Sequence, residues 1–356
     1  MTNIPRPSKP IPPKSSLDEA TEPDGKPYRI VTFPQTPPPK ARPAGHSKYL
    51  SDRLHGALFL TLKVQTPLHI STGIVAMGSD IGSRVALIKT MTQGNDQKLV
   101  IQGSSLKGCI RSVYEAITNS RLGVISKGIR YPSERLPWEK VRKEDPIELC
   151  PASLVFGASG KGWGWQGLIE FGDAMCESNG FSIGLMPPLH QPHPEKREIY
   201  FNQQGQAKGR KFYSFPKPSD QDPKPEINVQ QAAKDFTFTT EIHFKNLKPS
   251  ELGTLLIVLG QDPKYPIALK VGGGKPIGMG TLTVSVTAIE QAGNLRDRYS
   301  SYIAAESDRL VGTKLQEFMQ KQIKAAHSSL IQAPQLQQLA EVLSYPSDLQ
   351  PPSGMY

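Results

Sequence analysis

Cysteine is scarce in this sequence of 356 residues, which contains only Cys109, Cys150 and Cys176. The three cysteines lie too far apart for a Cys-x-x-Cys metal motif, and an odd number argues against a disulfide framework. No apolar run approaches the ~20 residues of a membrane-spanning helix, and the longest candidate, residues 252–260, is far shorter. These absences exclude disulfide-rich secreted domains and integral membrane proteins, and they favour a reducing cytoplasm as the compartment.

Acidic residues are outnumbered by basic ones. The sequence contains 42 Lys and Arg and 32 Asp and Glu, which gives a formal net charge of +10. The N-terminal residues are rich in proline and contain no apolar segment of the kind that a secretory signal needs. A basic chain without a basic amphipathic helix indicates an anionic partner, and nucleic acid is favoured over a membrane.

Residues 1–48 contain 12 of the 33 prolines and show little hydrophobic periodicity, which predicts an extended arm. Within this arm, residues 27–34 form an apolar island that either docks as a short strand or belongs to a disordered tail. The expected division of the remaining chain is a domain over residues 49–291, with insertions near residues 119–150 and 186–230, and a helical C-terminal tail over residues 292–356.

Strand, helix and strand patterns occur in that order both before and after the long insertion. Residues 58–64 alternate between apolar and polar, and residues 103–117 carry one apolar stripe at helical spacing. The pattern returns with a strand over residues 236–244, a helix that starts at Pro249 and a last strand over residues 282–286. This order predicts an α+β, ferredoxin-like fold with helices on one face of an antiparallel sheet. Two such halves that share one sheet would fit the pattern as well.

The start of the first predicted helix is the first candidate site. Its sequence, GSSLKGCIR, places Gly103, Ser104 and Ser105 where free backbone N–H groups and the positive end of the helix dipole favour a phosphate. Lys107 and Arg111 are four residues apart, so both cations lie on one face, away from the apolar stripe. The alternative is an ordinary capped and solvated helix.

Five glycines surround a lysine in the segment GGGKPIGMG, which begins with Gly272, Gly273, Gly274 and Lys275. Such a loop can wrap an anionic strand with its backbone N–H groups. The Gly-Lys-Ser/Thr ending of a nucleotide-binding P-loop is missing. The segment therefore predicts either a phosphate-binding loop or a tight connection between two strands.

Two further segments carry candidate residues. Asp80 is the only carboxylate in the loop after the first strand, where it either binds a metal ion near a phosphodiester or makes a local turn. In the segment GRKFY, Arg210 and Lys211 adjoin Tyr213. This combination either stacks on single-stranded RNA and neutralises its phosphates, or is simply a basic hairpin edge. No metal site is firmly predicted.

Four segments, taken in order, resemble the RAMP superfamily of CRISPR-associated proteins. They are TPLHI after the first strand, IQGSSLKGCIR at the first helix, CPASLVFG near the middle of the chain and the glycine-rich GGGKPIGMG. Each motif is weak alone, and the specificity comes from finding four of them in this order. The resemblance covers roughly residues 27–290, and the segment GRKFY is similar to a branch of the family found in type III systems.

The resemblance implies a ferredoxin-like fold, related to the RNA-recognition motif, that binds a CRISPR RNA guide along its backbone for antiviral defence. It implies stacking with other RAMP subunits and with the large subunit of a type III effector complex. It also implies a hairpin that inserts into the duplex of guide and target single-stranded RNA. Ser104, Ser105, Lys107 and Arg111 then become guide-phosphate contacts, and residues 272–275 line the same groove.

In family members that cleave, an acidic residue on the loop after the first strand directs metal-dependent cutting of target RNA. In this sequence Arg84, a candidate RNA-binding residue, stands where the acid is expected, and Asp80 lies four residues earlier. The subunit therefore either cleaves through Asp80 with a divalent ion such as Mg²⁺, with no tightly bound cofactor, or is a non-cleaving spacer. The alternative function is a stand-alone RAMP endoribonuclease that processes precursor CRISPR RNA, with His69 or His243 and Tyr213 as acid–base candidates.

Overall fold

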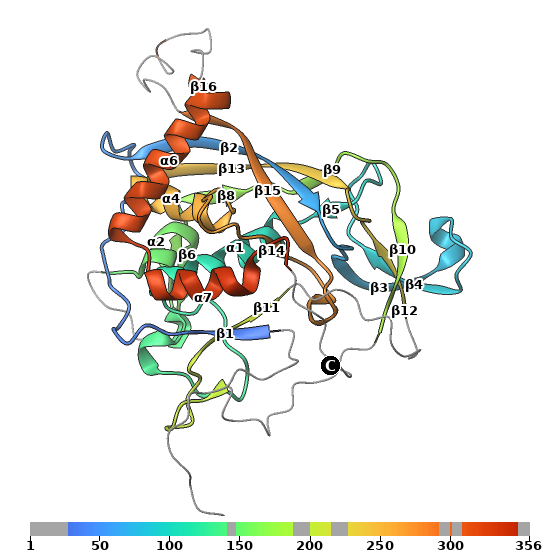
Figure 1. Ribbon diagram of the computed structural model, residues 1–356, viewed down its shortest axis with the longest axis horizontal. Coiled ribbons are helices and arrows are strands. Elements are labelled where there is room, and N and C mark those ends of the chain that lie inside the picture. Colours follow the sequence, from blue (N-terminus) through green and yellow to red (C-terminus); the bar gives the residue numbers. More distant parts are fainter. Residues whose placement is uncertain are drawn as a thin grey trace, which may run out of the picture.

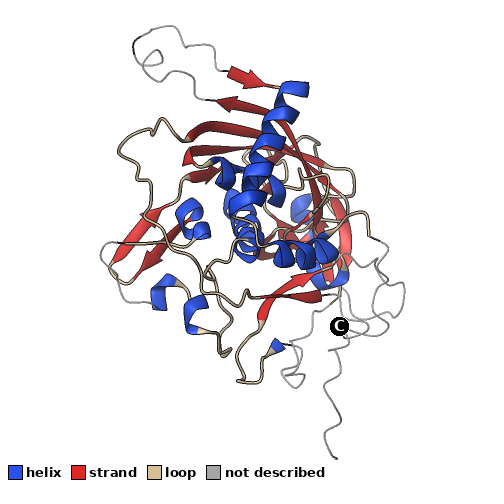
Figure 2. Ribbon diagram, turned by 60° about the vertical axis from the view of Figure 1, so that its left-hand side comes forward, coloured by secondary structure: helices blue, strands red, loops and turns tan. Residues whose placement is uncertain are grey.

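The computed structural model describes residues 28–140, 147–187, 200–214, 227–291, 300 and 308–347. Figure 1 shows a large sheet with helices packed against it and a smaller sheet beside it, and Figure 2 distinguishes the helices from the strands. Parts of the predicted arm, insertions and tail lie outside the described residues. In the described part of the chain, no helix is both long enough and apolar enough to cross a membrane.

The centre of the protein is a ferredoxin-like unit. Its elements are β2 (Leu54–Val64), α1 (Gly103–Ile117), β8 (Ile169–Phe171), β9 (Ala174–Cys176), β13 (Thr237–Leu247), α4 (Pro249–Val258) and β15 (Thr281–Gln291). In the sheet, β15 and β13 flank β2, and β8 and β9 pair with β13, all antiparallel. Two β-α-β halves therefore interleave in one antiparallel sheet, which confirms the predicted fold class.

Alternation of apolar and polar residues places one side of each central strand in the core. In β2 this buried side carries Leu58, Leu60, Leu62 and Val64. Full burial of one such side chain stabilises the fold by about 1.5–3 kcal/mol. Because intrinsic β-propensities span only ~1 kcal/mol, this row of buried side chains decides the position of β2.

The helices cover the sheet in two layers. α1 buries Leu106, Ile110, Val113 and Ile117, which form the stripe predicted from the sequence. α6 (Gly312–Ser329) packs against α4, and α7 (Ala333–Leu343) packs against α1. A Cβ on Gly253 of α4 would lie 1.9 Å from the backbone oxygen of Gln322, so α4 and α6 meet closely at a glycine. The helices of the C-terminal part thus form the outer layer.

A segment within the predicted arm forms a strand. β1 (Tyr28–Thr32) pairs antiparallel with β11 (Gly209–Tyr213) along its whole length. The side-chain oxygen of Gln338 in α7 accepts a hydrogen bond from the last backbone N–H of β1 at 2.9 Å. The buried guanidinium of Arg135 donates to two backbone oxygens just after β1, at 2.7 and 2.8 Å. Of the two alternatives for this island, the docked strand is the one observed.

A second sheet of four strands stands beside the first. Its order is β10 (Ser182–Met186), β12 (Ile227–Gln231), β4 (Leu87–Met91) and β3 (Ser71–Met77). β3 and β4 are the hairpin that follows the first central strand, with the 3₁₀ helix η1 (Gly78–Ile81) at its tip. The second predicted insertion therefore begins and ends in strands of this sheet.

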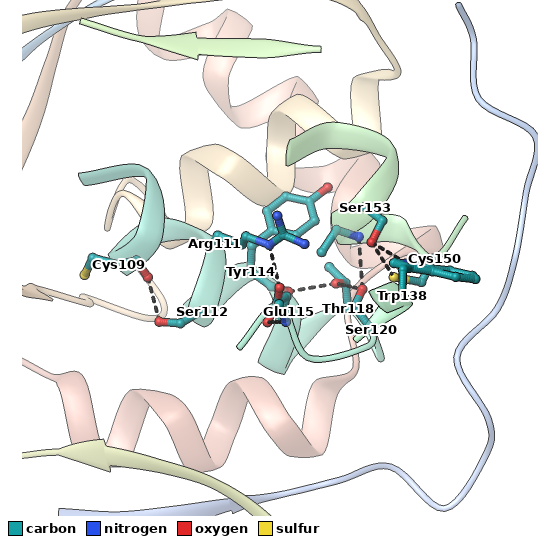
Figure 3. Close-up of polar contacts among 12 residues, drawn as sticks. Cys109, Arg111, Ser112, Tyr114, Glu115, Thr118, Ser120, Trp138, Cys150 and Ser153 are labelled. Atoms are coloured by element: carbon teal, nitrogen blue, oxygen red, sulfur yellow. Dashed lines mark hydrogen bonds and ion pairs between the residues drawn. The ribbon is translucent and has the colours of Figure 1, made fainter. Parts of the chain in front are cut away.

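Shorter elements complete the described chain. They are β5 (Val100–Ile101), η2 (Ser133–Arg135), η3 (Trp138–Lys140), α2 (Pro151–Phe156), β6 (Gly157–Gly160), β7 (Trp163–Gln166), β14 (Leu269–Lys270), η4 (Lys275–Ile277) and β16 (Asp308–Leu310). The three tryptophans gather in one small apolar cluster around β6 and β7. The indole N–H of Trp138 donates to the hydroxyl of Ser153 at 2.9 Å (Figure 3), which ties this cluster to α2.

Candidate nucleic-acid interface

Two candidate segments that are far apart in the sequence meet at one pocket. The start of α1 forms one wall and the glycine-rich loop after β14 forms the other, and the pocket has a volume of about 270 Å³. Its lining includes Ser104, Ser105, Gly108 and Ser112 of α1 together with Gly272 and Lys275 of the loop. Hydroxyl groups, backbone and one ammonium group therefore face a common space. This set of groups is typical of sites that contact the phosphates and sugars of a nucleic acid.

The glycine-rich wall has a backbone conformation that requires glycine. Gly272 has φ +79°, and a Cβ there would lie 2.4 Å from the backbone oxygen of His69. Gly273 donates its N–H to that same oxygen at 2.9 Å. At the other end of the loop, Gly280 donates its N–H to the backbone oxygen of Pro67 at 2.8 Å. The segment after β2, which carries the TPLHI motif, thus holds the glycine-rich loop in place through backbone hydrogen bonds.

A second lysine lies buried behind Lys275. Lys270 donates from Nζ to the backbone oxygen of Gly278 at 3.1 Å and to the hydroxyl of Thr281 at 3.2 Å. Burial lowers the pKa of Lys270 to about 7, and repulsion from Lys275 adds to this shift. No motif in the local sequence distinguishes Lys270 from an exposed lysine, so its burial is not predicted from the sequence.

The first backbone amide of α1 already has an anionic partner. Gly103 donates its N–H to Oδ1 of Asp173 at 2.7 Å, and a carboxylate is favoured at this end of a helix dipole. The prediction of a free amide at Gly103 is therefore wrong, because a residue between β8 and β9 caps the helix. Asp173 lies far from α1 in the chain, so no local signal predicts this cap. On the α1 side, the pocket offers the hydroxyls of Ser104 and Ser105 instead.

The two predicted cations of α1 do not line the pocket. Burial lowers the pKa of Lys107, and repulsion from Arg111 adds to this shift. The Nε of Arg111 donates to Oε1 of Glu115 at 2.6 Å, one turn further along α1 (Figure 3). Arg210 of β11 pairs with the other oxygen of the same carboxylate. Among the residues that the structure describes, Lys275 is therefore the cation that lines the pocket, whereas buried Glu115 joins Arg111 to Arg210.

Lys211 and Tyr213 belong to an aromatic cluster on the β1–β11 ribbon. The Nζ of Lys211 is 4.6 Å from the ring centre of Tyr28 and 4.7 Å from that of Tyr213. Tyr200 stacks on Tyr28 with ring centres 5.8 Å apart, and the two hydroxyls share a hydrogen bond. The cluster combines the cation and the aromatic rings of a stacking surface. Tyr28 and Tyr200 were missed because they come from two other segments of the chain.

One known protein family matches the part of the chain that contains most of this site. The model of the RAMP superfamily matches residues 61–283, which include α1, the β3–β4 hairpin and the glycine-rich loop. This chain belongs to the RAMP superfamily. Among solved structures, a chain of a Type IV-B CRISPR complex is similar at 19% sequence identity and a TM-score of 0.37. That match covers 65% of this chain and 90% of the other. No curated protein matches the chain.

In this RAMP protein, Asp80 lies at the tip of the β3–β4 hairpin. It is exposed in η1, with Oδ1 3.4 Å from the hydroxyl of Ser79, and Arg84 is exposed beyond it. Within the described ranges, no three His, Cys, Asp or Glu side chains gather in a way that could hold a metal ion. A single carboxylate fits Mg²⁺ where RNA phosphates and water supply the remaining oxygen ligands.

The two histidines considered for acid–base chemistry occupy different environments in the RAMP fold. His69 is buried beneath the glycine-rich loop, with Nδ1 2.7 Å from the backbone oxygen of Gln230, and burial lowers its pKa. His243 is exposed on β13, with Nε2 3.1 Å from Oε1 of Glu241. A general acid or base must reach the proton that it transfers. Burial of His69 therefore favours a structural role, as support for the loop.

Proposed function

We propose that this RAMP protein is a backbone subunit of a type III CRISPR effector complex and that it holds the CRISPR RNA guide. The observation that carries the proposal is the pocket between α1 and the glycine-rich loop. A pocket of hydroxyls, backbone and one lysine suits the phosphates and sugars of an RNA strand and reads no base. Such binding, independent of sequence, suits a subunit that must accept any guide.

The walls of the pocket supply complementary contacts to an RNA backbone. The hydroxyls of Ser104 and Ser105 can donate to phosphate oxygens and accept from a ribose 2′-hydroxyl. Lys275 neutralises a phosphate, while Gly108 and Gly272 leave room for the strand beside both walls. The formal charge of +10 adds attraction at longer range.

The proposed partners are target single-stranded RNA, other RAMP subunits and the large subunit of the complex. Exposed apolar side chains on the β3–β4 hairpin support this part of the proposal. Val75, Met77 and Leu87 are 54%, 59% and 58% exposed, and Met77 lies opposite Leu87 in the register. Apolar side chains that share one exposed face mark an interaction surface.

The proposal includes cleavage of target RNA, with Asp80 as the residue that would direct it. The exposed carboxylate at the hairpin tip can approach a bound strand, where it would hold Mg²⁺ together with phosphate oxygens of that strand. A divalent ion supplies Lewis-acid polarisation of a phosphodiester when it is bound. A subunit that lacks this activity would still hold the guide, because the pocket does not include Asp80.

Copurification tests the proposal. The tagged chain is expressed with its neighbouring genes, purified, and the RNA that accompanies it is sequenced. We expect short RNAs with a repeat-derived tag, recovered together with other RAMP subunits. Lys275→Gln combined with Ser104→Ala should reduce the recovered RNA, whereas Arg309→Gln on β16, at the far end of β15, should not.

Two other outcomes contradict the proposal. Recovery of the chain alone, with metal-independent cutting of repeat RNA, would support the processing endoribonuclease instead. Recovery of a folded chain with no RNA would refute guide binding.

A further inference from the structure

The glycine-rich loop faces the pocket on one side and the second sheet on the other. Within the part of the chain that the structure describes, the lining of the pocket includes Lys275 but neither Ile277 nor Met279 of the same loop. Met279 is buried together with Met186 of β10 and Val229 of β12, and Ile277 packs against these three side chains. The four residues of this apolar cluster, Met186, Val229, Ile277 and Met279, are called the loop anchor below.

Backbone contacts join the loop anchor closely to Lys275. The backbone oxygen of Gly274 accepts hydrogen bonds from the N–H groups of Ile277 and Met279, both at 3.1 Å. A Cβ on Gly274 would overlap Sδ of Met279, so the methionine side chain packs directly on Gly274. Because Gly274 directly precedes Lys275, a displacement of Met279 shifts the backbone that carries the ammonium group of the pocket.

β12 supports the loop at a second point, before Lys275 in the chain. The backbone oxygen of Gln230 in β12 lies 2.7 Å from Nδ1 of buried His69. The backbone oxygen of His69 in turn accepts the N–H of Gly273 at 2.9 Å. Oε1 of Gln230 accepts the backbone N–H of Met91 at 2.8 Å, which fixes β12 to β4. β12 therefore supports the loop before Lys275, through Gly273, and after it, through the loop anchor.

A lysine on a fixed backbone binds a phosphate more tightly than a lysine on a mobile one. The lysine side chain is a flexible four-carbon stem, and a loop that becomes ordered only on binding adds a further loss of entropy. Close-packed apolar side chains respond to the loss of even one methylene group. The packing of the loop anchor therefore fixes the backbone at Lys275 before a ligand arrives.

We propose that Met186 and Met279 are positioning residues, which hold Lys275 toward the phosphate of the bound RNA although neither touches the strand. The inference rests on the proposed function, because the ligand is the same RNA. It gives β10 and β12, which lie at the two ends of the second predicted insertion, a role in RNA binding. None of the four sequence motifs contains either strand.

Fluorescence anisotropy with fluorescein-labelled polyuridine tests the proposal on the full chain. Lys275→Gln removes a charge-assisted contact and should weaken binding about tenfold. Met279→Ala and Met186→Ala each leave a cavity behind η4 and should weaken binding about threefold to tenfold, because the loop then becomes ordered only on binding. Met279→Leu keeps the apolar volume and should bind like the wild type.

The salt dependence and a double-mutant cycle separate positioning from a general structural role. Met279→Ala should lower the slope of log affinity against log salt by up to about 0.7, the value for one phosphate of a single strand. If Met279 acts through Lys275, Met279→Ala should weaken binding no further in a chain that already carries Lys275→Gln. A general loss of structure would weaken binding by the same factor in both backgrounds.

The control removes a methionine from another part of the core. Met319 of α6 packs against the main core and does not line the pocket, so Met319→Ala should bind polyuridine like the wild type. Thermal unfolding checks that each variant folds. Ile277→Ala takes the place of Met279→Ala if that variant unfolds, because Ile277 is only partly buried in the loop anchor.

Each contrary outcome refutes a stated part of the argument. If Lys275→Gln weakens binding while folded Met279→Ala and Met186→Ala bind like the wild type, the pocket stands and the positioning role is refuted. If Met279→Ala weakens binding equally with and without Lys275→Gln, the methionine does not act through Lys275, and the positioning role is again refuted. If the wild-type chain does not bind polyuridine, the proposed function fails and the positioning role fails with it.

Discussion

Gly108 is expected to lower the free energy of unfolding, and its missing side chain leaves space in the pocket. It lies in the interior of α1, where glycine is about 0.8–1.0 kcal/mol less favourable than alanine. A Cβ at Gly108 would meet no atom within 4 Å, and its φ is not in the left-handed region, so alanine fits without strain. Gly108→Ala should therefore raise the free energy of unfolding by nearly that amount, with a rise of a few degrees in the melting temperature.

A larger side chain at the same position should act on RNA binding instead. Gly108 lines the pocket, so a glutamate there places a carboxylate beside the phosphate of the RNA strand that we propose binds there. Two unit charges about 4 Å apart repel by roughly 4 kcal/mol at an effective dielectric constant near 20. A flexible side chain relieves part of this by turning away, so we expect at least about a tenfold loss of affinity, roughly 1.4 kcal/mol. Gly108→Gln has the same size without the charge and isolates the electrostatic part.

Thermal unfolding and fluorescence anisotropy with labelled polyuridine measure the two effects on the same samples. Gly108→Ala should melt higher than the wild type, and Gly108→Glu should stay folded while it binds RNA more weakly than Gly108→Gln. If Gly108→Glu stays folded and binds RNA as tightly as Gly108→Ala, the assignment of the phosphate to this pocket is refuted.

Three further predictions concern the loop, the buried lysine and the hairpin. Gly272→Ala, with its Cβ 2.4 Å from the backbone oxygen of His69 at φ +79°, should lower the free energy of unfolding by about 1–3 kcal/mol in urea denaturation. Gly45→Ala, at φ +84° in open space, is the control and should cost less. The pKa of Lys270 is lowered to about 7 in the fold, so between pH 7 and about 10 the unfolded chain binds the extra proton and stability rises with pH. Lys270→Met should flatten that rise in urea denaturation across this range, and an unchanged slope would contradict the burial argument. Asp80→Ala should remove one Mg²⁺-dependent cleavage position from the target RNA of an assembled complex, and an unchanged cleavage pattern would make the subunit a non-cleaving spacer.

Local sequence patterns were sufficient to predict the ferredoxin-like unit. The alternation in β2 and the apolar stripe of α1 each report one buried face, and burial dominates the energetics of both elements. The paired strands and the helix that starts at Pro249 follow for the same reason. Both walls of the pocket were predicted as motifs, the family resemblance implied that they line one groove, and the fold brings them together at one pocket.

Contacts between segments that are distant in the sequence could not be predicted from local sequence patterns. The cap from Asp173 on α1 and the pairing of β1 with β11 both depend on tertiary packing, which no spacing along the chain reports. The pairing of Arg111 with Glu115 is different, because the two residues are four apart on a helix and that spacing favours an ion pair. The ion pair of Arg111 with Glu115 was therefore predictable from the sequence alone.

The two walls of the pocket are held by different parts of the fold, which pre-organises the space between them. α1 buries its apolar stripe against the sheet and contacts α7, so its serine face cannot rotate without exposing the stripe. The glycine-rich loop is fixed separately, through its hydrogen bonds to the backbone of Pro67 and His69 after β2. A strand that binds between two fixed walls loses less free energy to ordering of the protein. Under the proposed function, rigid walls with small residues on both sides let the pocket hold an RNA backbone without an extensive set of base contacts.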